Sequence, residues 1–167
     1  FALWTPDARR IVFRTLTGLR WMDPDGGGGS QAIPGTSVAD LPSSVSPDSH
    51  TLAFIRQTAE SGGDIYVLSL EGDPQPHPVV KTPGYDGGAF YSPDGTELVW
   101  RASRPEGAEL EEYRTLLKQG LIRPTKLDIY VMKADGTNVR RLTNNNAANF
   151  CPLFTADGKK VMWSSNV

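Results

Sequence analysis

The amino-acid sequence predicts an all-β protein built from repeated four-stranded antiparallel sheets, and three observations support this prediction. A short turn sequence recurs four times, a run of apolar residues follows each copy, and a further strand-like segment then ends in an acidic residue and Gly. The 167 residues also include 17 glycines and 13 prolines, a share above the usual ~12%. A chain of this composition turns often, as many short strands require.

The repeated turn consists of Ser or Thr, then Pro or Ala, then Asp. Pro presets the backbone angle φ, and the Asp side chain can cap the turn. The four Asp residues are separated by 41, 46 and 63 positions, and the longest interval contains an insertion. A spacing in the low forties is typical of the roughly 40–45 residues of a propeller blade. The four copies are residues 4–7 (WTPD), 45–48 (VSPD), 91–95 (YSPDG) and 154–158 (FTADG).

Three further segments complete each repeat in a constant order. The apolar run after the turn has consecutive apolar residues, as expected when neighbouring sheets cover both faces of a strand. A third strand then ends in a hairpin-type turn, and a more polar fourth strand suits an exposed blade edge. The apolar runs are 11–13, 52–55, 98–100 and 161–163; the third strands are 19–22, 64–68 and 128–132; the fourth strands are 31–33, 78–80 and 139–143.

The sequence therefore predicts a partial β-propeller of about three and a half antiparallel blades. We place blade one at about 1–38, blade two at 39–84, blade three at 85–147 and a half blade at 148–167. Propellers typically have 4–8 blades. Three and a half blades would leave apolar faces exposed, so the chain is expected to be part of a longer propeller or to self-associate.

The repeat resembles the TolB-type β-propeller family of bacteria. Residues 91–100 (YSPDGTELVW) and 128–136 (DIYVMKADG) carry the likeness, and residues 140–143 (RRLT) fit the last strand of that repeat. Ala8 and Ser49 depart from the pattern, because the family usually has Gly there, and Ala156 replaces a Pro. The resemblance implies a scaffold that docks other proteins in the bacterial envelope, and hence a periplasmic or otherwise extracytoplasmic location.

Two segments interrupt the repeat. Residues 26–30 (GGGGS) are interpreted as a long loop in blade one, with an engineered linker as the alternative. Residues 104–126 form an insertion in blade three, and its part 108–119 has the spacing of a short amphipathic helix. This helix is either a lid over one propeller face or a recognition element. Its apolar positions are Leu110, Tyr113 and Leu117.

Composition excludes several classes of protein. The net charge of -2 without a basic cluster argues against nucleic-acid binding. One Cys makes neither an internal disulfide nor a cysteine metal cage. No apolar stretch approaches the ~18 residues of a membrane span, so no membrane insertion is expected, and the first residues lack the layout of a signal peptide.

A search for chemistry yields no catalytic, cofactor or metal site. His50 and His77 lie in different blades and are predicted to be solvated loop residues. Residues 23–26 (DPDG) resemble the start of a calcium loop, but glycines follow and Pro34 stands where the loop needs Glu. The sequence has no Gly-x-Ser-x-Gly nucleophile elbow, and Cys151 is predicted to pack in the core of an inner strand.

Several residues recur at matching positions of the repeat, which indicates a structural role. The Asp residues of the turns build those turns, and Asp64 and Asp128 are predicted to brace the starts of third strands through hydrogen bonds. A recurring aromatic set is predicted to pack between blades. It comprises Trp4, Trp21, Tyr66, Tyr91, Tyr130 and Phe154.

We therefore expect a protein without catalytic activity or cofactors, acting as a protein-binding or scaffold module that forms a homo-oligomer. The alternative is a substrate-gating propeller segment of a prolyl-oligopeptidase-type or tricorn-type peptidase, and a further alternative is an engineered or evolved propeller fragment. The sequence does not identify the protein partner. Besides the helix residues above, the expected contacts are the loop residues Tyr85, Asp86, Asn144, Asn145, Asn146 and Asn149.

Overall fold

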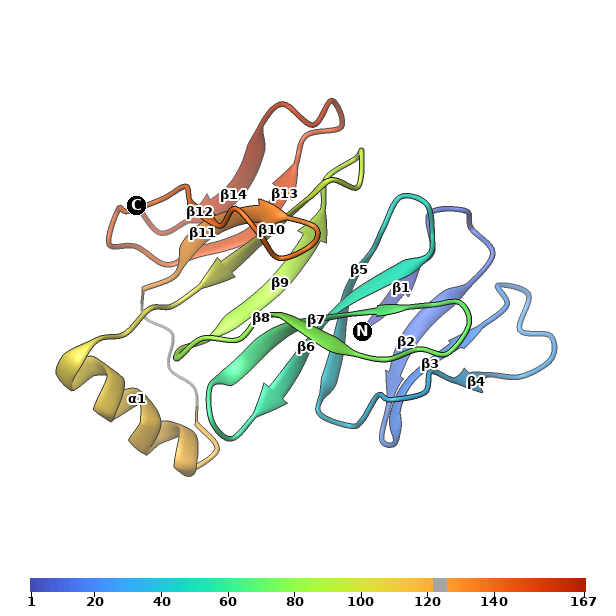
Figure 1. Cartoon of the computed structure of the whole chain (residues 1–167), viewed down its shortest axis with the longest axis horizontal. Helices are drawn as coiled ribbons and strands as arrows, with labels where there is room; N and C mark the ends of the chain where they lie inside the picture. The colour runs from blue at the N-terminus through green and yellow to red at the C-terminus, as the bar shows by residue number, and fades with distance from the viewer. Residues whose placement is uncertain (122–125) are drawn as a thin grey trace.

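The computed structural model describes residues 1–121 and 126–167, which fold into four antiparallel sheets placed side by side (Figure 1). The first three sheets each have four strands in chain order, and the last is a hairpin of two strands. The first sheet contains β1 (Ala2–Trp4), β2 (Ile11–Thr15), β3 (Gly18–Met22) and β4 (Gln31–Ala32). The second contains β5 (Asp40–Val45), β6 (Thr51–Thr58), β7 (Gly62–Ser69) and β8 (His77–Val80). The third contains β9 (Asp86–Tyr91), β10 (Glu97–Ala102), β11 (Asp128–Lys133) and β12 (Arg140–Arg141), and the hairpin is β13 (Asn149–Phe154) with β14 (Val161–Ser165).

The first strands of successive sheets are neighbours, since β1 contacts β5, β5 contacts β9, and β9 contacts β13. They are the inner strands of successive blades, and this arrangement confirms the predicted partial β-propeller. The sheets are called blade one, blade two, blade three and the half blade below.

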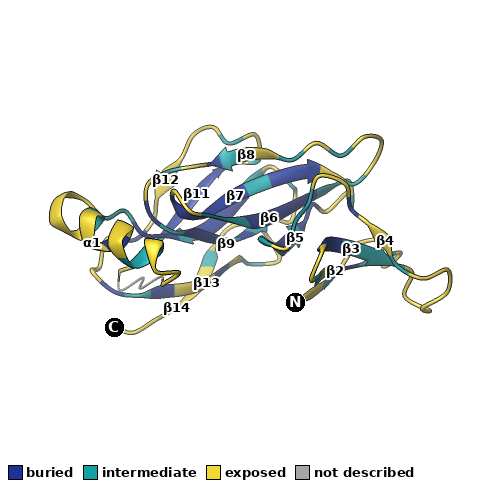
Figure 2. Cartoon of the chain, turned by 90° about the horizontal axis from the view of Figure 1, so that it is seen from below, coloured by how far each residue is buried: buried dark blue, intermediate teal, exposed yellow. Residues whose placement is uncertain are grey.

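The core lies between the blades. One cluster joins blades one and two through Leu19, Leu52 and Phe54, and a second joins blades two and three through Ala53 and Trp100. Neighbouring residues of β6 therefore serve different clusters, which explains why its apolar residues are consecutive. Figure 2 shows the buried residues concentrated in the middle of the molecule, in strands such as β6 and β7.

The half blade differs from this pattern. Phe154 and Val161 pack against a small cluster in blade three, but Met162 and Trp163 remain 57% and 42% exposed. The prediction that both faces of every second strand are covered is therefore wrong for β14. The reason is that no further sheet packs on its far side among the described residues.

The four repeated turns have one geometry. In blade three, Ser92 Oγ donates a hydrogen bond to Asp94 Oδ1 at 2.6 Å, and the Glu97 N–H donates to Ser92 Oγ at 2.9 Å. The same bonds recur in the other three copies, which confirms that these Asp residues build the turns. The residue after Asp is left-handed in every copy, with φ of 58° at Ala8, 67° at Ser49, 75° at Gly95 and 69° at Gly158.

The two interruptions of the repeat are also visible. Residues 26–30 lie in the loop between β3 and β4, and Arg20 Nε donates to Ser30 Oγ at 2.8 Å. The insertion in blade three contains α1 (Gly107–Lys118), close to the predicted helix, and Gly120 follows it with φ of 72°. Residues 122–125 of the insertion lie outside the described residues. No helix in the described part of the chain is long and apolar enough to cross a membrane.

Candidate functional site

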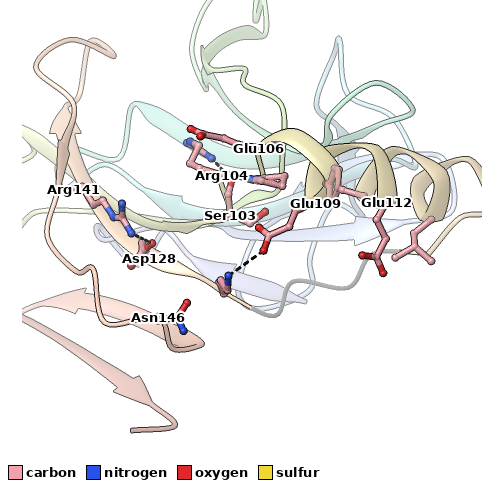
Figure 3. Close-up of a pocket in the computed structure, with 12 residues that line it drawn as sticks. Ser103, Arg104, Glu106, Glu109, Glu112, Asp128, Arg141 and Asn146 are labelled. Atoms are coloured by element: carbon pink, nitrogen blue, oxygen red, sulfur yellow. Dashed lines mark hydrogen bonds and ion pairs between the residues drawn. The ribbon is translucent and has the colours of Figure 1, made fainter.

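A pocket of about 540 Å³ lies between α1, the start of β11 and the connection from blade three to the half blade (Figure 3). The inner strand β9 starts at the same end of blade three as this pocket, because Asp86 at the start of β9 pairs with Ala102 at the end of β10. Most of the polar lining is ionic. The lining residues are Ser103, Arg104, Pro105, Glu106, Glu109, Glu112, Tyr113, Leu116, Lys126, Asp128, Arg141 and Asn146.

Three ion pairs involve the lining residues. Lys126 Nζ lies 3.1 Å from Glu109 Oε1, and Arg141 Nη2 lies 2.6 Å from Asp128 Oδ2 (Figure 3). The third pair joins Arg104 to the buried carboxylate of Asp86 in blade three. Two further lining carboxylates, Glu106 and Glu112, are exposed and have no ion pair within the described ranges. Among the described residues, no neighbouring side chain neutralises the negative charge of Glu106 and Glu112.

Asp86 anchors Arg104 at the pocket. Arg104 Nη2 donates to Asp86 Oδ1 at 2.6 Å, and Trp100 Nε1 donates to the same oxygen at 2.8 Å. Asp86 is fully buried, and burial raises the pKa of its carboxyl group, while the nearby Arg104 charge opposes that rise. Arg104 is consequently held in place by a group inside the blade and presents a fixed positive charge to the pocket.

Tyr113 attaches α1 to blade two. Its hydroxyl donates to the Ser61 carbonyl oxygen at 2.7 Å, and burial raises the pKa of Tyr113 to about 12. The Ser61 hydroxyl in turn donates to Asp64 Oδ2 at 2.5 Å. Burial also raises the pKa of the Asp64 carboxyl group. The helix is therefore positioned by a buried side chain and not only by the ends of its loop.

The inner strands share a buried polar residue that the sequence analysis did not recognise as a repeat. Asp40, Asp86 and Asn149 are the first residues of β5, β9 and β13, each stands eight positions before the Asp of its turn, and all are fully buried. Asp40 receives two hydrogen bonds from Arg56, at 2.7 and 2.8 Å. Asn149 Nδ2 donates to the Leu127 carbonyl oxygen at 2.7 Å. The constant spacing from the turn was the available signal.

The predicted contact residues separate into two groups. Tyr113 and Asn146 line the pocket, and Leu110 and Leu117 are half-buried on α1. Asn144 accepts a hydrogen bond from Arg141 Nη2 at 2.7 Å, beside the pocket.

The second group serves the interior of the blades. Tyr85 accepts a hydrogen bond from Arg101 at 3.1 Å, and Asn145 pairs with Asn149. Asp86 and Asn149 were expected in surface loops, and this placement was wrong, because both are buried at strand starts. Their side chains are bonded inside the protein and are not available to a partner in this structure.

Other sequence-based placements also need correction. Cys151 lies in inner strand β13 but is exposed, and Trp4 is 58% exposed, since no sheet covers these strands on that side within the described residues. His77 lies in β8 and not in a loop, although it is exposed as expected. The prediction for Asp128 is confirmed, because Thr143 Oγ1 and Arg141 donate to it, and Asp64 accepts comparable bonds from Ser61 and Thr58.

Comparison with solved structures shows what this fold is similar to. TolB from Acinetobacter baumannii superposes with a TM-score of 0.71 and 25% sequence identity, over 97% of this chain and 36% of TolB. The chain has a TolB-like propeller fold. A prolyl endopeptidase structure also superposes, with a TM-score of 0.61 and 14% identity, over 89% of this chain and 22% of that one.

Comparison of the sequence alone gives a relative that is named as a peptidase. The uncharacterized peptidase YuxL of Bacillus subtilis (strain 168) is 26% identical over an alignment of 140 residues, and this alignment covers 73% of this chain and 21% of YuxL. No family model matches the sequence. The chain therefore spans about a fifth of this relative and about a third of the solved TolB structure.

Proposed function

We propose that the chain is a non-catalytic propeller module that binds a polypeptide in the pocket beside α1. The observation that carries this proposal is the inserted helix, which Tyr113 fixes on blade two so that α1 and blade three enclose a pocket of about 540 Å³. Binding residues commonly lie on inserted segments that a rigid scaffold positions. The TolB-like fold supports the same role and an extracytoplasmic location.

The charges of the pocket favour a polypeptide with basic side chains. Glu106 and Glu112 are exposed and have no ion pair within the described structure, whereas Arg104 and Arg141 are each engaged with a carboxylate. An incoming Lys or Arg would meet two carboxylates without displacing an ion pair between described residues. Such complementarity mainly improves the association rate and the choice of partner.

The proposal is tested by selecting peptides from a random displayed library against the whole chain. The affinities of selected peptides are then measured by calorimetry for the wild type, Glu112→Lys and the control Asp73→Lys. Asp73 is exposed and has no ion pair among the described residues. We expect Glu112→Lys to weaken binding about tenfold, as a reversed charge at a contact does, and Asp73→Lys to have little effect. Equal affinity for all three proteins would contradict the proposal.

A second candidate function is the substrate-gating segment of a peptidase, and the match to the uncharacterized peptidase YuxL favours it. In this case substrate peptides would contact the pocket before they reach a catalytic domain that lies outside residues 1–167. The test is the reading frame that follows the codon of Val167 in the parent gene. A downstream α/β-hydrolase segment with Gly-x-Ser-x-Gly would favour this function. Further propeller blades without such a segment would favour the non-catalytic binding module.

We also propose that copies of the chain associate. Exposed apolar side chains mark both terminal sheets, including Trp4 of blade one and Leu153, Met162 and Trp163 of the half blade. Surfaces of this kind are common at protein interfaces. Light scattering at micromolar concentration is expected to give more than the mass of one chain, and a mass of 18.2 kDa would contradict association.

A further inference from the structure

The loop between β3 and β4 contains an aspartate with fewer restraints than the other aspartates that precede a glycine. Asp25 is followed by Gly26 and by three further glycines. A glycine after Asp leaves its backbone nitrogen accessible to the aspartyl side chain, since no Cβ stands beside that nitrogen. The chain has four other Asp-Gly pairs, so their reactivity can be compared within one molecule. These pairs begin at Asp86, Asp94, Asp135 and Asp157.

Hydrogen bonds restrain the carboxylates of the other four pairs. Asp94 Oδ1 accepts three, at 2.6, 2.8 and 3.0 Å, from the residues two positions before and after it. Asp135 and Asp157 each accept two from residues at these distances along the chain. Such bonds lower the pKa of Asp94 to about 2 and also lower the pKa values of Asp135 and Asp157, which keeps the three groups ionised. Asp86 is buried, accepts three bonds and lies in the paired strand β9.

Asp25 is held by less. Its Oδ1 accepts one hydrogen bond within the described structure, from the Gly27 N–H at 2.8 Å. The backbone that follows has space, because nothing lies within 4 Å of the position that a Cβ would take at residues 28 and 29. The Gly26 N–H donates to the Asp23 carbonyl oxygen at 3.0 Å, and the glycines of the three exposed turns make the same bond at 2.8–2.9 Å. The difference therefore lies in the side chain and in the following backbone.

We propose that Asp25 is a modification site at which the chain converts spontaneously to isoaspartate. In the first step the Gly26 nitrogen bonds to Cγ of the protonated carboxyl group, the Cγ–OH bond breaks, and the hydroxyl leaves as water with the proton of that nitrogen. In the second step water adds to the α-carbonyl carbon of the five-membered ring, and the bond from this carbon to the Gly26 nitrogen breaks. The chain then runs through Cγ, and a free α-carboxylate remains. The water lost equals the water gained, so no oxidant, reductant or cofactor takes part.

The loop can accommodate this product without a change in blade one. Isoaspartate lengthens the backbone path by a methylene group. Residues 27–29 lie between the modified position and Ser30, whose hydroxyl accepts a hydrogen bond from Arg20 Nε at 2.8 Å. A slightly longer flexible loop costs little free energy. We therefore expect the modification to mark the age of a molecule while β3 and β4 stay paired. The inference is independent of the pocket beside α1 and of the proposed function.

The test is to incubate the whole chain at mildly acidic pH, digest it, and separate the peptides by liquid chromatography with mass spectrometry. Isoaspartyl peptides keep the parent mass but differ in retention time and in the fragments formed after electron transfer. In the folded protein isoaspartate should accumulate at Asp25 at least about tenfold faster than at Asp94, because opening the Asp94 turn breaks two more hydrogen bonds to a charged group. In urea the two rates should come within about threefold of each other, since unfolding removes the turn bonds. Equal rates in the folded protein, or the same ratio in urea, would overturn the proposal.

Two variants assign the signal and its cause. Asp25→Glu should abolish isomerisation in this loop, because a glutamyl side chain would have to close a six-membered ring, which forms far more slowly. Thr96→Val removes one hydrogen bond to Asp94 and should raise the rate there about threefold to tenfold, while the rate at Asp25 stays unchanged. Thr96 is exposed, so this substitution leaves the core intact. An unchanged rate at Asp94 in Thr96→Val would contradict the proposal, because the hydrogen bonds would then not be what protects the turn.

Thermal unfolding of the aged chain checks the consequence for blade one. The melting temperature should stay the same as Asp25 converts. A decrease in proportion to the converted fraction would contradict the role of residues 27–29 as the segment that absorbs the longer backbone.

Discussion

Blade three and the half blade share the turn geometry between their first two strands but have very different surroundings. Trp100 is fully buried, between blades two and three, whereas Trp163 at the corresponding position is 42% exposed. Asp86 and Asn149 both begin inner strands and are both buried, so the two regions agree at the inner end. The geometry of the turn therefore depends on local sequence, while the burial of the second strand depends on the neighbouring strands and sheets.

The largest expected contrast lies between the two tryptophans. Trp100→Ala should lower the free energy of unfolding by about 3–5 kcal/mol, because it leaves a cavity between two blades. Trp163→Ala should lower it by less than about 1 kcal/mol, because much of the side chain is already in water. Urea denaturation followed by circular dichroism measures both. Similar losses in the two variants would show that the half blade is covered in solution.

A second contrast concerns the starts of the two inner strands. Arg104→Met should cost about 3 kcal/mol, since it leaves the buried Asp86 carboxylate without its ion pair. Asn149→Ala should cost about 1–3 kcal/mol, the effect of removing a buried hydrogen-bonding side chain that carries no charge.

The pH dependence separates these two effects. Burial raises the pKa of Asp86 above its unfolded value, and loss of Arg104 would raise it further. The protonated group needs no counter-ion, so the cost of Arg104→Met should shrink as the pH falls through this raised pKa. The cost of Asn149→Ala should not change in the same way. Urea denaturation at a series of pH values from neutral to acid tests this, and a cost of Arg104→Met that stays constant throughout would contradict it.

The turns offer a smaller contrast, because two copies have Gly at the left-handed position and two do not. Ala8→Gly should stabilise the protein by about 0.5–1 kcal/mol, since left-handed backbone is strained for Ala. Gly158→Ala should destabilise it by a similar amount. Ser49→Gly should gain less than Ala8→Gly, because the Ser49 hydroxyl accepts a hydrogen bond from the Asp7 N–H at 3.0 Å. Thermal unfolding of the three variants would reveal a different order if the turns were not equivalent.

The smallest effect is expected from the pH dependence of one turn. Hydrogen bonds from Ser92 and Thr96 lower the pKa of Asp94 from 3.8 to about 2. A carboxyl group whose pKa falls on folding stabilises the protein above its unfolded pKa and loses this contribution as the pH falls through its folded value. The stability difference between wild type and Asp94→Asn should therefore shrink between pH 4 and pH 2. A difference that stays constant in this range would show that the carboxylate charge does not matter.

The sequence predicted the propeller because the recurring turn is local. Ser92, Asp94 and Gly95 bond within a few residues, so the pattern is sufficient to specify the turn. Burial was less predictable, and Cys151 shows why. It has φ of 50° beside an irregularity in the pairing of β13 with β14, and no sheet within the described residues covers it.

The pocket was only partly predictable, because its groups meet across distant segments. Tyr113 was recognised from helical spacing, but its bond to Ser61 joins positions 52 residues apart. Arg104 was not singled out, since its role depends on Asp86, 18 residues earlier. The first contact follows from the packing of α1 on blade two and the second from the pairing of β9 with β10, and neither leaves a periodic signal in the sequence.

Hydrogen exchange of the monomeric chain tests the central contrast most directly, by comparing the backbone amides of β10 with those of β14. We expect β10 to exchange only through global unfolding, and β14 to exchange at least about a hundredfold faster because its outer face is exposed and it pairs with β13 alone among the described strands. Equal protection of the two strands in the monomer would contradict the account.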